Sequence, residues 1–273
     1  MGLGFLSVPQ AVVPISTGPI EVPILYRQAR SVLAVFPVDP AVLEPVLEPV
    51  GLQAVPVFSG RPVIVVAFFD YRDTTIGPYH EAAAAAVVVP RGMASPQHPL
   101  LDLLLPVRWR RLGLYIFDLP VTTPVANAAG RELWGLPKFV TDIPIAWEGE
   151  RSEASVCDPV SGEPMVTLVG YAAGGSRLPL RSLFLYSWLG PALVRTEVDL
   201  RGMASVLRSP TFHLHLGARL QPMAQCLAIL GLDSAMPALV QLAPSFQARL
   251  NLGRRVPLPQ AVEARAEAQP RAA

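Results

Sequence analysis

The chain has 273 residues, of which 51% are hydrophobic and 16% charged, and its formal net charge is +1. These values favour a sizeable apolar core and argue against global disorder. The near-neutral charge, without a basic run interleaved with aromatic residues, argues against nucleic acid as a partner. No stretch of about 18 apolar residues is free of proline and charge, so no membrane span is expected.

Cofactor and metal motifs are also absent from the sequence. Neither a GxxxxGK[ST] loop nor a GxGxxG fingerprint is present, so no nucleotide cofactor is expected. Cys157 and Cys226 form neither a disulfide framework nor a metal knuckle, which is typical of a protein of the reducing cytoplasm. The first residues carry no basic segment, so no signal peptide is predicted. His213 and His215 share one side of a predicted strand but have no third ligand at a standard spacing, so no metal site is predicted.

The first third of the chain predicts an arm, a strand, a helix and a second strand. Prolines at 9, 14, 19 and 23 favour an extended N-terminal arm over residues 1–23. Residues 24–36 read as a strand, and Asp39-Pro40 predicts the start of a helix over 41–47. The continuous β-branched and aromatic run at 62–69 indicates a strand buried on both faces, which a polar turn at 70–78 follows.

The middle of the chain contains the best-marked helix. An alanine-rich run at 82–89 predicts a strand whose small side chains let another group approach closely, and 112–119 predicts the next strand. Between them lies a Pro- and Arg-containing loop with a short helix at 101–105. Thr123-Pro124 predicts the N-cap and first turn of a helix over 125–133, which Gly135 ends.

Short strands dominate the remainder, and Pro-Gly pairs separate them. An extended segment is predicted at 139–147, a helix or irregular segment at 221–230, and a frayed tail at 260–273. Further strands are predicted at 155–157, 165–171, 183–188, 192–198, 211–220 and 248–252. The pattern indicates an α+β, β-rich single domain over residues 1–259, with a closed or nearly closed antiparallel sheet and a few peripheral helices.

Lys138 is the only lysine in the chain, which otherwise uses 21 arginines. An arginine guanidinium stays protonated, whereas a lysine amine can lose its proton and attack a carbonyl. Trp134, Leu136 and Phe139 surround Lys138 in the sequence, and burial among such side chains disfavours the charged form of an amine. Lys138 is therefore a predicted nucleophile. The alternative is a lysine that lays its stem on an apolar patch with its amine in water.

Five other residues are candidates for the same site. Glu81 leads into the alanine-rich strand, where a carboxylate needs a partner, and it would move protons, hold substrate or pair with an arginine. Tyr79 and Trp134 are predicted in the core or the pocket wall. Arg131 and Glu132 end the helix before Lys138, where they would either reach the substrate or form a structural ion pair.

The motif Gly130-Arg131-Glu132-Leu133 followed by Gly135-Leu136-Pro137-Lys138 resembles the lysine motif of the acetoacetate decarboxylase family. The segment from Phe117-Asp118 to Pro124 resembles the one that precedes this motif, and Tyr79 and Glu81 resemble the family's tyrosine-x-glutamate element. The resemblance implies that Lys138 forms a Schiff base with a keto substrate and that Glu81 matches an acidic residue of the site. It also implies a cone-like antiparallel β barrel with the lysine deep inside, usually in homo-oligomers.

Three positions depart from the family pattern. Phe139 stands where the decarboxylases have a second lysine, Val66 stands near the place of a second carboxylate, and no arginine lies near Pro19. Phe139 and Val66 are therefore predicted substrate-binding residues, with Tyr79, Trp134, Arg131 and Glu132. These departures weaken acetoacetate as the specific substrate more than they weaken the covalent chemistry.

The predicted function is a Schiff-base lyase that decarboxylates a small 3-oxo acid through a Lys138 iminium, without metal or organic cofactor. The first alternative is an aldolase-dehydratase or hydratase that acts on a 2-oxo acid through the same iminium. The second is a non-catalytic barrel that binds an apolar small molecule, with Lys138 as a counter-ion. The predicted partner is a small oxo acid, and neither nucleic acid nor membrane is expected.

Overall fold

The computed structural model describes residues 4–102, 104–208, 211–217 and 221–256. Its centre is a ring of seven strands in the order β6-β5-β3-β16-β14-β13-β7, which the pairing of β7 with β6 closes. The strands of the ring are β3 (Ile24–Pro37), β5 (Val63–Thr74), β6 (Tyr79–Pro90), β7 (Gly113–Val121), β13 (Leu183–Leu189), β14 (Ala192–Arg208) and β16 (Leu239–Leu250). Each neighbouring pair in the ring is antiparallel except β7 and β13, which are parallel. The predicted β-rich α+β fold with a closed barrel is confirmed.

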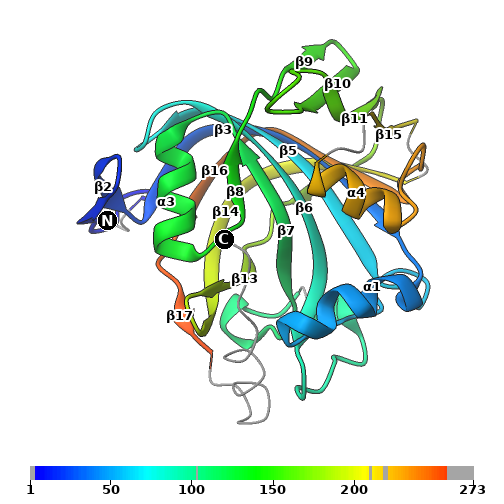
Figure 1. Cartoon of the computed structure of the whole chain (residues 1–273), viewed down its shortest axis with the longest axis horizontal. Helices are drawn as coiled ribbons and strands as arrows, with labels where there is room; N and C mark the ends of the chain where they lie inside the picture. Colours follow the sequence, from blue (N-terminus) through cyan, green and yellow to red (C-terminus); the bar gives the residue numbers. More distant parts are fainter. Residues whose placement is uncertain (1–3, 103, 209–210, 218–220, 257–273) are drawn as a thin grey trace.

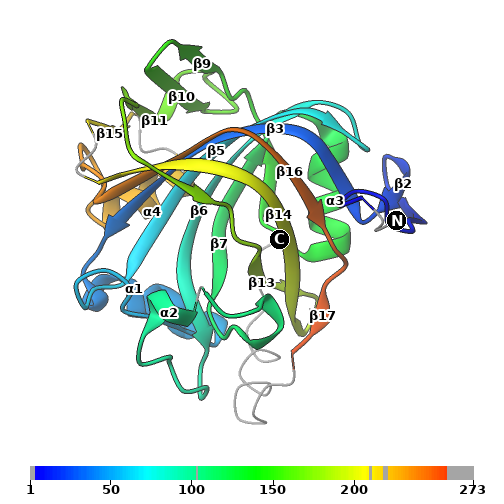
Figure 2. The same ribbon diagram turned by 180° about the vertical axis from the view of Figure 1, so that it is seen from behind.

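Smaller elements surround the ring (Figures 1 and 2). At its edges lie β4 (Leu52–Ala54), β8 (Lys138–Val140), β12 (Ser176–Pro179) and β17 (Arg254–Arg255). A second sheet contains β9 (Ile145–Glu148), β10 (Arg151–Cys157), β11 (Pro164–Tyr171) and β15 (His213–Leu216), and β1 (Ala11–Ile15) pairs with β2 (Gly18–Val22). The helices are α1 (Pro40–Leu47), α2 (Pro99–Asp102), α3 (Pro124–Trp134) and α4 (Pro222–Ile229), with 3-10 turns η1 (Glu48–Val50) and η2 (Val107–Trp109).

Two apolar clusters use opposite faces of the same strands. Because side chains alternate along a strand, β6 sends Ala83 and Ala85 into one cluster and Ala82, Ala84 and Ala86 into the other. The α3-side cluster includes Val65, Ala67, Ala83, Ala85, Ala126, Ala129 and Trp134. The α4-side cluster includes Val66, Phe68, Ala82, Ala84, Met223, Ala224 and Leu227. In Figure 1, α3 lies on the left of the barrel, well separated from α1 and α4 on the right.

The N-terminal segment differs from the prediction. Residues 1–23 were expected to form an extended arm, but β1 and β2 pair as an antiparallel hairpin from Ala11–Val22 to Ile15–Gly18. Gly18 provides the positive φ of 115° that the turn requires. The hairpin lies beside α3 (Figure 1), and Ile15, Ile20 and Val22 are buried in the α3-side cluster. The tail predicted at 260–273 lies outside the described residues.

Several strands are longer than their sequence patterns indicate. The predicted turn at 70–78 is wrong for its first half, because β5 continues to Thr74 before the chain turns. Polar residues such as Arg72 and Asp73 are exposed on this part of the strand, while Tyr71 is buried. Similarly, β14 extends to Arg208 and β16 begins at Leu239, and the two cross the back of the barrel (Figure 2). The segment predicted as extended at 139–147 divides into β8 and β9.

Candidate active site

Helix α3 and the turn after it place Lys138. The Thr123 side chain accepts a hydrogen bond from the Ala126 amide at the helix start. The helix ends at Gly135, whose φ is 61° and whose missing Cβ would lie only 1.9 Å from the carbonyl oxygen of Trp188. The chain then turns through Pro137 into β8, where Lys138 pairs with Leu119 of β7. Lys138 is thus held by backbone on both sides, as the Thr-Pro and Gly signals predict.

The Lys138 amine is buried and carries a carboxylate partner. The residue is 4% exposed, and its Nζ donates a hydrogen bond of 2.6 Å to Oε2 of Glu81, which is itself buried. The stem of the lysine passes over α3 at Gly130, where an added Cβ would lie 2.4 Å from Cδ and 2.5 Å from Cε. Glycine at this position is therefore required for the path of the stem. The alternative of an amine in water does not fit this geometry.

Three tyrosines surround Glu81. The Tyr71 hydroxyl donates to Oε1 of Glu81 at 3.3 Å, and the Tyr26 and Tyr79 hydroxyls share a hydrogen bond of 3.0 Å. Nζ of Lys138 lies 5.7 Å from the centre of the Tyr79 ring. Burial, reinforced by the nearby Glu81, raises the pKa of Tyr26 and Tyr71, and burial followed by Tyr26 raises that of Tyr79. The three phenols therefore stay protonated over the working pH range and act as neutral donors.

Tyr71 and Tyr26 were not predicted as site residues. In the antiparallel pair of β5 and β6, Tyr71 lies opposite Tyr79, and Phe69 lies opposite Glu81. Tyr71 alternates with Phe69 and Ala67 along β5, and this alternation was the signal that could have identified it. A turn was predicted there instead. For Tyr26, the available signal was its place near the start of the strand predicted at 24–36.

Two other predicted residues lie next to Lys138. One guanidinium nitrogen of Arg131 donates to the Lys138 carbonyl at 3.1 Å, rather than to Glu132. The Phe139 side chain packs against the α4-side cluster, opposite to the face that Glu81 occupies. Both residues line the cavity described below.

The structure does not bring the remaining three predicted residues to the amine. Trp134 is fully buried, and its indole N–H donates to the Asn251 carbonyl at 2.8 Å, so it has a packing role. Val66 points into the α4-side cluster because it lies one residue out of phase with the site-facing Val65 and Ala67. Glu132 accepts hydrogen bonds from the amide and the hydroxyl of Ser16, so it fastens the N-terminal hairpin to α3.

A cavity of about 920 Å³ lies beside Lys138. The cavity lies at a break in the barrel wall. One edge of β7 pairs first with β13, at Leu114 and Tyr115, and then with β8, from Leu119 onward, so this edge is unpaired between the two. Its lining contains members of both apolar clusters. The lining residues are Pro49, Val50, Tyr115, Ile116, Asp118, Arg131, Gly135, Leu136, Pro137, Lys138, Phe139, Ser187, Trp188, Gln221, Pro222 and Met223.

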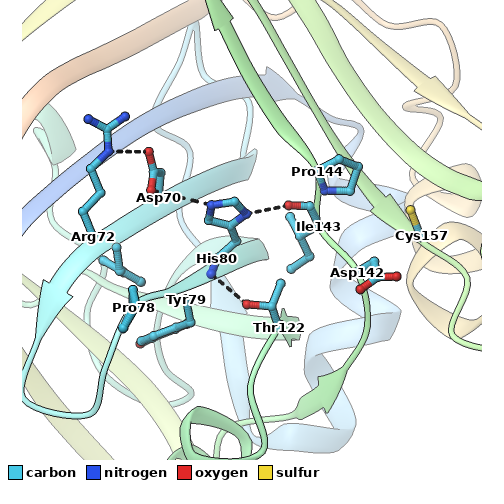
Figure 3. Close-up of a pocket in the computed structure, with 11 residues that line it drawn as sticks. Asp70, Arg72, Pro78, Tyr79, His80, Thr122, Asp142, Ile143, Pro144 and Cys157 are labelled. Atoms are coloured by element: carbon cyan, nitrogen blue, oxygen red, sulfur yellow. Dashed lines mark hydrogen bonds and ion pairs between the residues drawn. The ribbon is translucent and has the colours of Figure 1, made fainter.

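A second depression, of about 800 Å³, lies at the start of β6 and is lined by His80 (Figure 3). The His80 amide donates to Oγ1 of Thr122 at 2.9 Å, and its Nδ1 lies 2.7 Å from the Ile143 carbonyl oxygen. Its Nε2 lies 3.6 Å from a carboxylate oxygen of Asp70, to which Arg72 also donates at 2.8 Å. These contacts hold the strand one residue before Glu81 and so help to position that carboxylate.

Two other sequence expectations concern metals and membranes. The rings of His213 and His215 stack with centroids 6.1 Å apart, so they share one side of β15. Within the described ranges, no three His, Cys, Asp or Glu side chains are grouped to hold a metal ion. No helix in the same ranges has the length and apolar character needed to span a bilayer.

Comparison with known proteins gives the family. The sequence profile of "Acetoacetate decarboxylase (ADC)" matches residues 12–173, whereas a search of curated proteins found no significant match. Among solved structures, acetoacetate decarboxylase from Legionella pneumophila is similar, with a TM-score of 0.61, 15% identity, and coverage of 93% of this chain and 94% of that one.

Two further solved structures have the same fold. One is an acetoacetate decarboxylase-like enzyme from Sphingomonas wittichii RW1, with a TM-score of 0.58, 19% identity, and coverage of 86% and 92%. The other is the enduracididine biosynthesis enzyme MppR in complex with pyruvate, with a TM-score of 0.58, 16% identity, and coverage of 85% and 89%. Because the profile spans more than half of the sequence and the barrel agrees with it, the chain belongs to the acetoacetate decarboxylase family.

Proposed function

We propose that this protein is a Schiff-base lyase in which Lys138 forms an iminium with an oxo acid. The observation that carries the proposal is the buried contact of 2.6 Å between Nζ of Lys138 and Glu81. A lysine ammonium cannot attack a carbonyl, but a short hydrogen bond gives its proton a direct path to a carboxylate. Transfer along this bond leaves a free amine and a neutral Glu81 at the same moment.

Glu81 then serves as a proton donor in a later step. The amine attacks the keto carbon, and the carbinolamine loses its hydroxyl as water when Glu81 returns the proton. The resulting iminium accepts the electron pair of the carbon–carbon bond to the carboxylate, so a 3-oxo acid releases carbon dioxide and leaves an enamine. A proton from solvent adds to the enamine carbon, and water hydrolyses the resulting iminium, which releases a ketone and restores the amine. The lysine itself serves as the electron sink, so the proposed reaction uses no metal or organic cofactor.

The tyrosines and Arg131 support this chemistry. Tyr71, as a neutral phenol, donates to the oxygen of Glu81 that Lys138 does not use, which orients the carboxylate. Arg131 lines the cavity and is the guanidinium nearest in structure to the Lys138 backbone, which suits it to bind a substrate carboxylate. The predicted cytoplasmic location and homo-oligomeric assembly remain predictions within this proposal.

The size and lining of the cavity support a second candidate reaction. Its volume of about 920 Å³ exceeds the needs of a four-carbon oxo acid, and Phe139 rather than a second cation lies beside the lysine. The similar enzyme MppR has been solved with "the condensation product of pyruvate and imidazole 4-carboxaldehyde". Aldol addition and dehydration on a 2-oxo acid, through an enamine made from the same iminium, is therefore the second candidate.

Borohydride trapping tests the proposal. The protein is incubated with acetoacetate, pyruvate or longer oxo acids, reduced, and weighed by mass spectrometry, with Lys138→Arg as the matched control that keeps a charge beside Glu81. A substrate-dependent mass increase on Lys138 that the variant lacks supports the lyase. Carbon dioxide release then favours decarboxylation, and a condensation product with an added aldehyde favours the aldolase. Binding of oxo acids without any adduct would refute both and leave a binding protein.

A further inference from the structure

Asp118 is a half-buried carboxylate that the proposed chemistry does not use. It lies on β7, where the pairing with β6 shifts between Ala85–Ile116 and Ala84–Asp118, so Phe117 is the extra residue of a β-bulge. The bulge places Asp118 opposite Ala84, on the α4-side face of the sheet, and into the lining of the cavity. Bulges of this kind re-aim a side chain, and here the side chain is charged.

No residue that the structure describes forms a hydrogen bond or an ion pair with Asp118. Burial alone raises its pKa from 3.8 to about 6. Arg131, the cation of the same cavity, instead donates to the Lys138 carbonyl. The field of Asp118 reaches α4, where it adds to the effect of burial in raising the pKa of Cys226 to about 11. A carboxylate that has lost part of its hydration and has no partner is costly to keep, and such groups concentrate at ligand sites.

The other residues that line the cavity indicate the chemical character of the ligand. Tyr115, Phe139 and Trp188 provide aromatic surface, and Ile116 and Met223 add apolar surface. Lys138 and Asp118 both line the cavity, and they lie on different faces of the sheet at the point where the wall is broken. A substrate chain that extends from Lys138 along this cavity would meet the aromatic side chains and Asp118.

We propose that Asp118 is a specificity-determining residue, and that the substrate is an oxo acid with an apolar chain and a hydrogen-bond donor, a hydroxyl or an ammonium group, at its far end. This proposal rests on the proposed Schiff-base function, because it takes the keto group to lie at Lys138. Asp118 binds the donor, the aromatic side chains pack on the chain, and the carboxylate gains the partner that it lacks without ligand. Acetoacetate and pyruvate carry no such donor and therefore cannot make this contact.

The test uses oxo acids of equal chain length that end in ammonium, hydroxyl or methyl. The measured quantity is the concentration that gives half-maximal borohydride trapping, in the native protein, in Asp118→Asn and in the exposed control Asp142→Asn. We expect the donor-ended acids to be preferred over the methyl-ended acid by about tenfold or more in the native protein and in the control, as a charge-assisted hydrogen bond provides. We expect Asp118→Asn to lower the preference to about threefold or less, because the neutral amide gives no charge-assisted hydrogen bond.

The two proposals fail in different ways. If short oxo acids are trapped but the native protein shows no preference, or if Asp118→Asn leaves the preference intact, the assignment of Asp118 is overturned and the lyase stands. If no oxo acid is trapped, the lyase fails. Calorimetric binding of saturated carboxylic acids that carry the same end groups and no keto group then tests Asp118 alone. Donor-dependent binding that Asp118→Asn abolishes supports the assignment, and binding without donor dependence overturns it.

Discussion

The substitution Gly130→Ala should displace the Lys138 amine without destabilising the fold. In an exposed helix, alanine is more favourable than glycine by about 1 kcal/mol, so the change should not weaken α3 itself. The new Cβ would lie 2.4 Å from Cδ and 2.5 Å from Cε of Lys138, whereas carbon atoms in contact prefer about 3.5–4.0 Å. The lysine stem must therefore move by about 1 Å or more. Because the lysine side chain is flexible, its displacement should change the stability of the fold little but the geometry of the site strongly.

The displacement should disrupt the Lys138–Glu81 contact of 2.6 Å. A misplacement of about 1 Å can lower the rate of a positioned reaction by about 100-fold. We expect the rate of borohydride-trapped adduct formation to fall about 100-fold in Gly130→Ala, while the thermal midpoint stays within a few degrees of that of the native protein. Val125→Ala, at the start of the same helix, is the control for a change in helix composition and should keep the native rate. Native trapping by Gly130→Ala would refute the argument that the stem's path over α3 sets the amine.

Three further changes test other contacts. Because burial raises the pKa of Asp118 from 3.8 to about 6, the contribution of Asp118 to the unfolding free energy should fall by about 3 kcal/mol as the pH rises through this window. Urea unfolding should show Asp118→Asn matching the native protein near pH 4 and exceeding it by about 3 kcal/mol at pH 8, and a difference independent of pH would contradict the burial argument. Tyr71→Phe removes the hydroxyl bound to Glu81 and should slow adduct formation by about tenfold; an unchanged rate would show that Glu81 needs no such support. Glu132→Ala removes the acceptor of the Ser16 amide and hydroxyl, so it should lower the unfolding free energy by about 1–2 kcal/mol and leave trapping unchanged, whereas impaired trapping with native stability would return Glu132 to the site.

Local patterns in the sequence predicted the elements that local physics controls. The Thr123 cap and the glycine at 135 marked α3 within one residue at each end, because caps and positive φ depend on single side chains. The alanine-rich run predicted β6, and the solitary lysine among apolar residues predicted a buried amine. The turn predicted at 70–78 was wrong because polar residues on the exposed side of β5 outweighed the alternation that continues through Tyr71.

The sequence by itself determined that the central strands are buried and where α3 begins and ends. It also determined that Lys138 lies at a helix-to-strand corner. Only the tertiary structure decided which carboxylate the amine meets. Glu81 and Glu132 were both candidates, and Glu81, 57 positions away along the chain, binds the amine while Glu132 binds the hairpin. Only the structure shows that a bulge turns Asp118 into the break between β13 and β8. Strand register and bulges depend on partners distant in sequence, and a slip of one residue reverses every side chain, so no local pattern contains them.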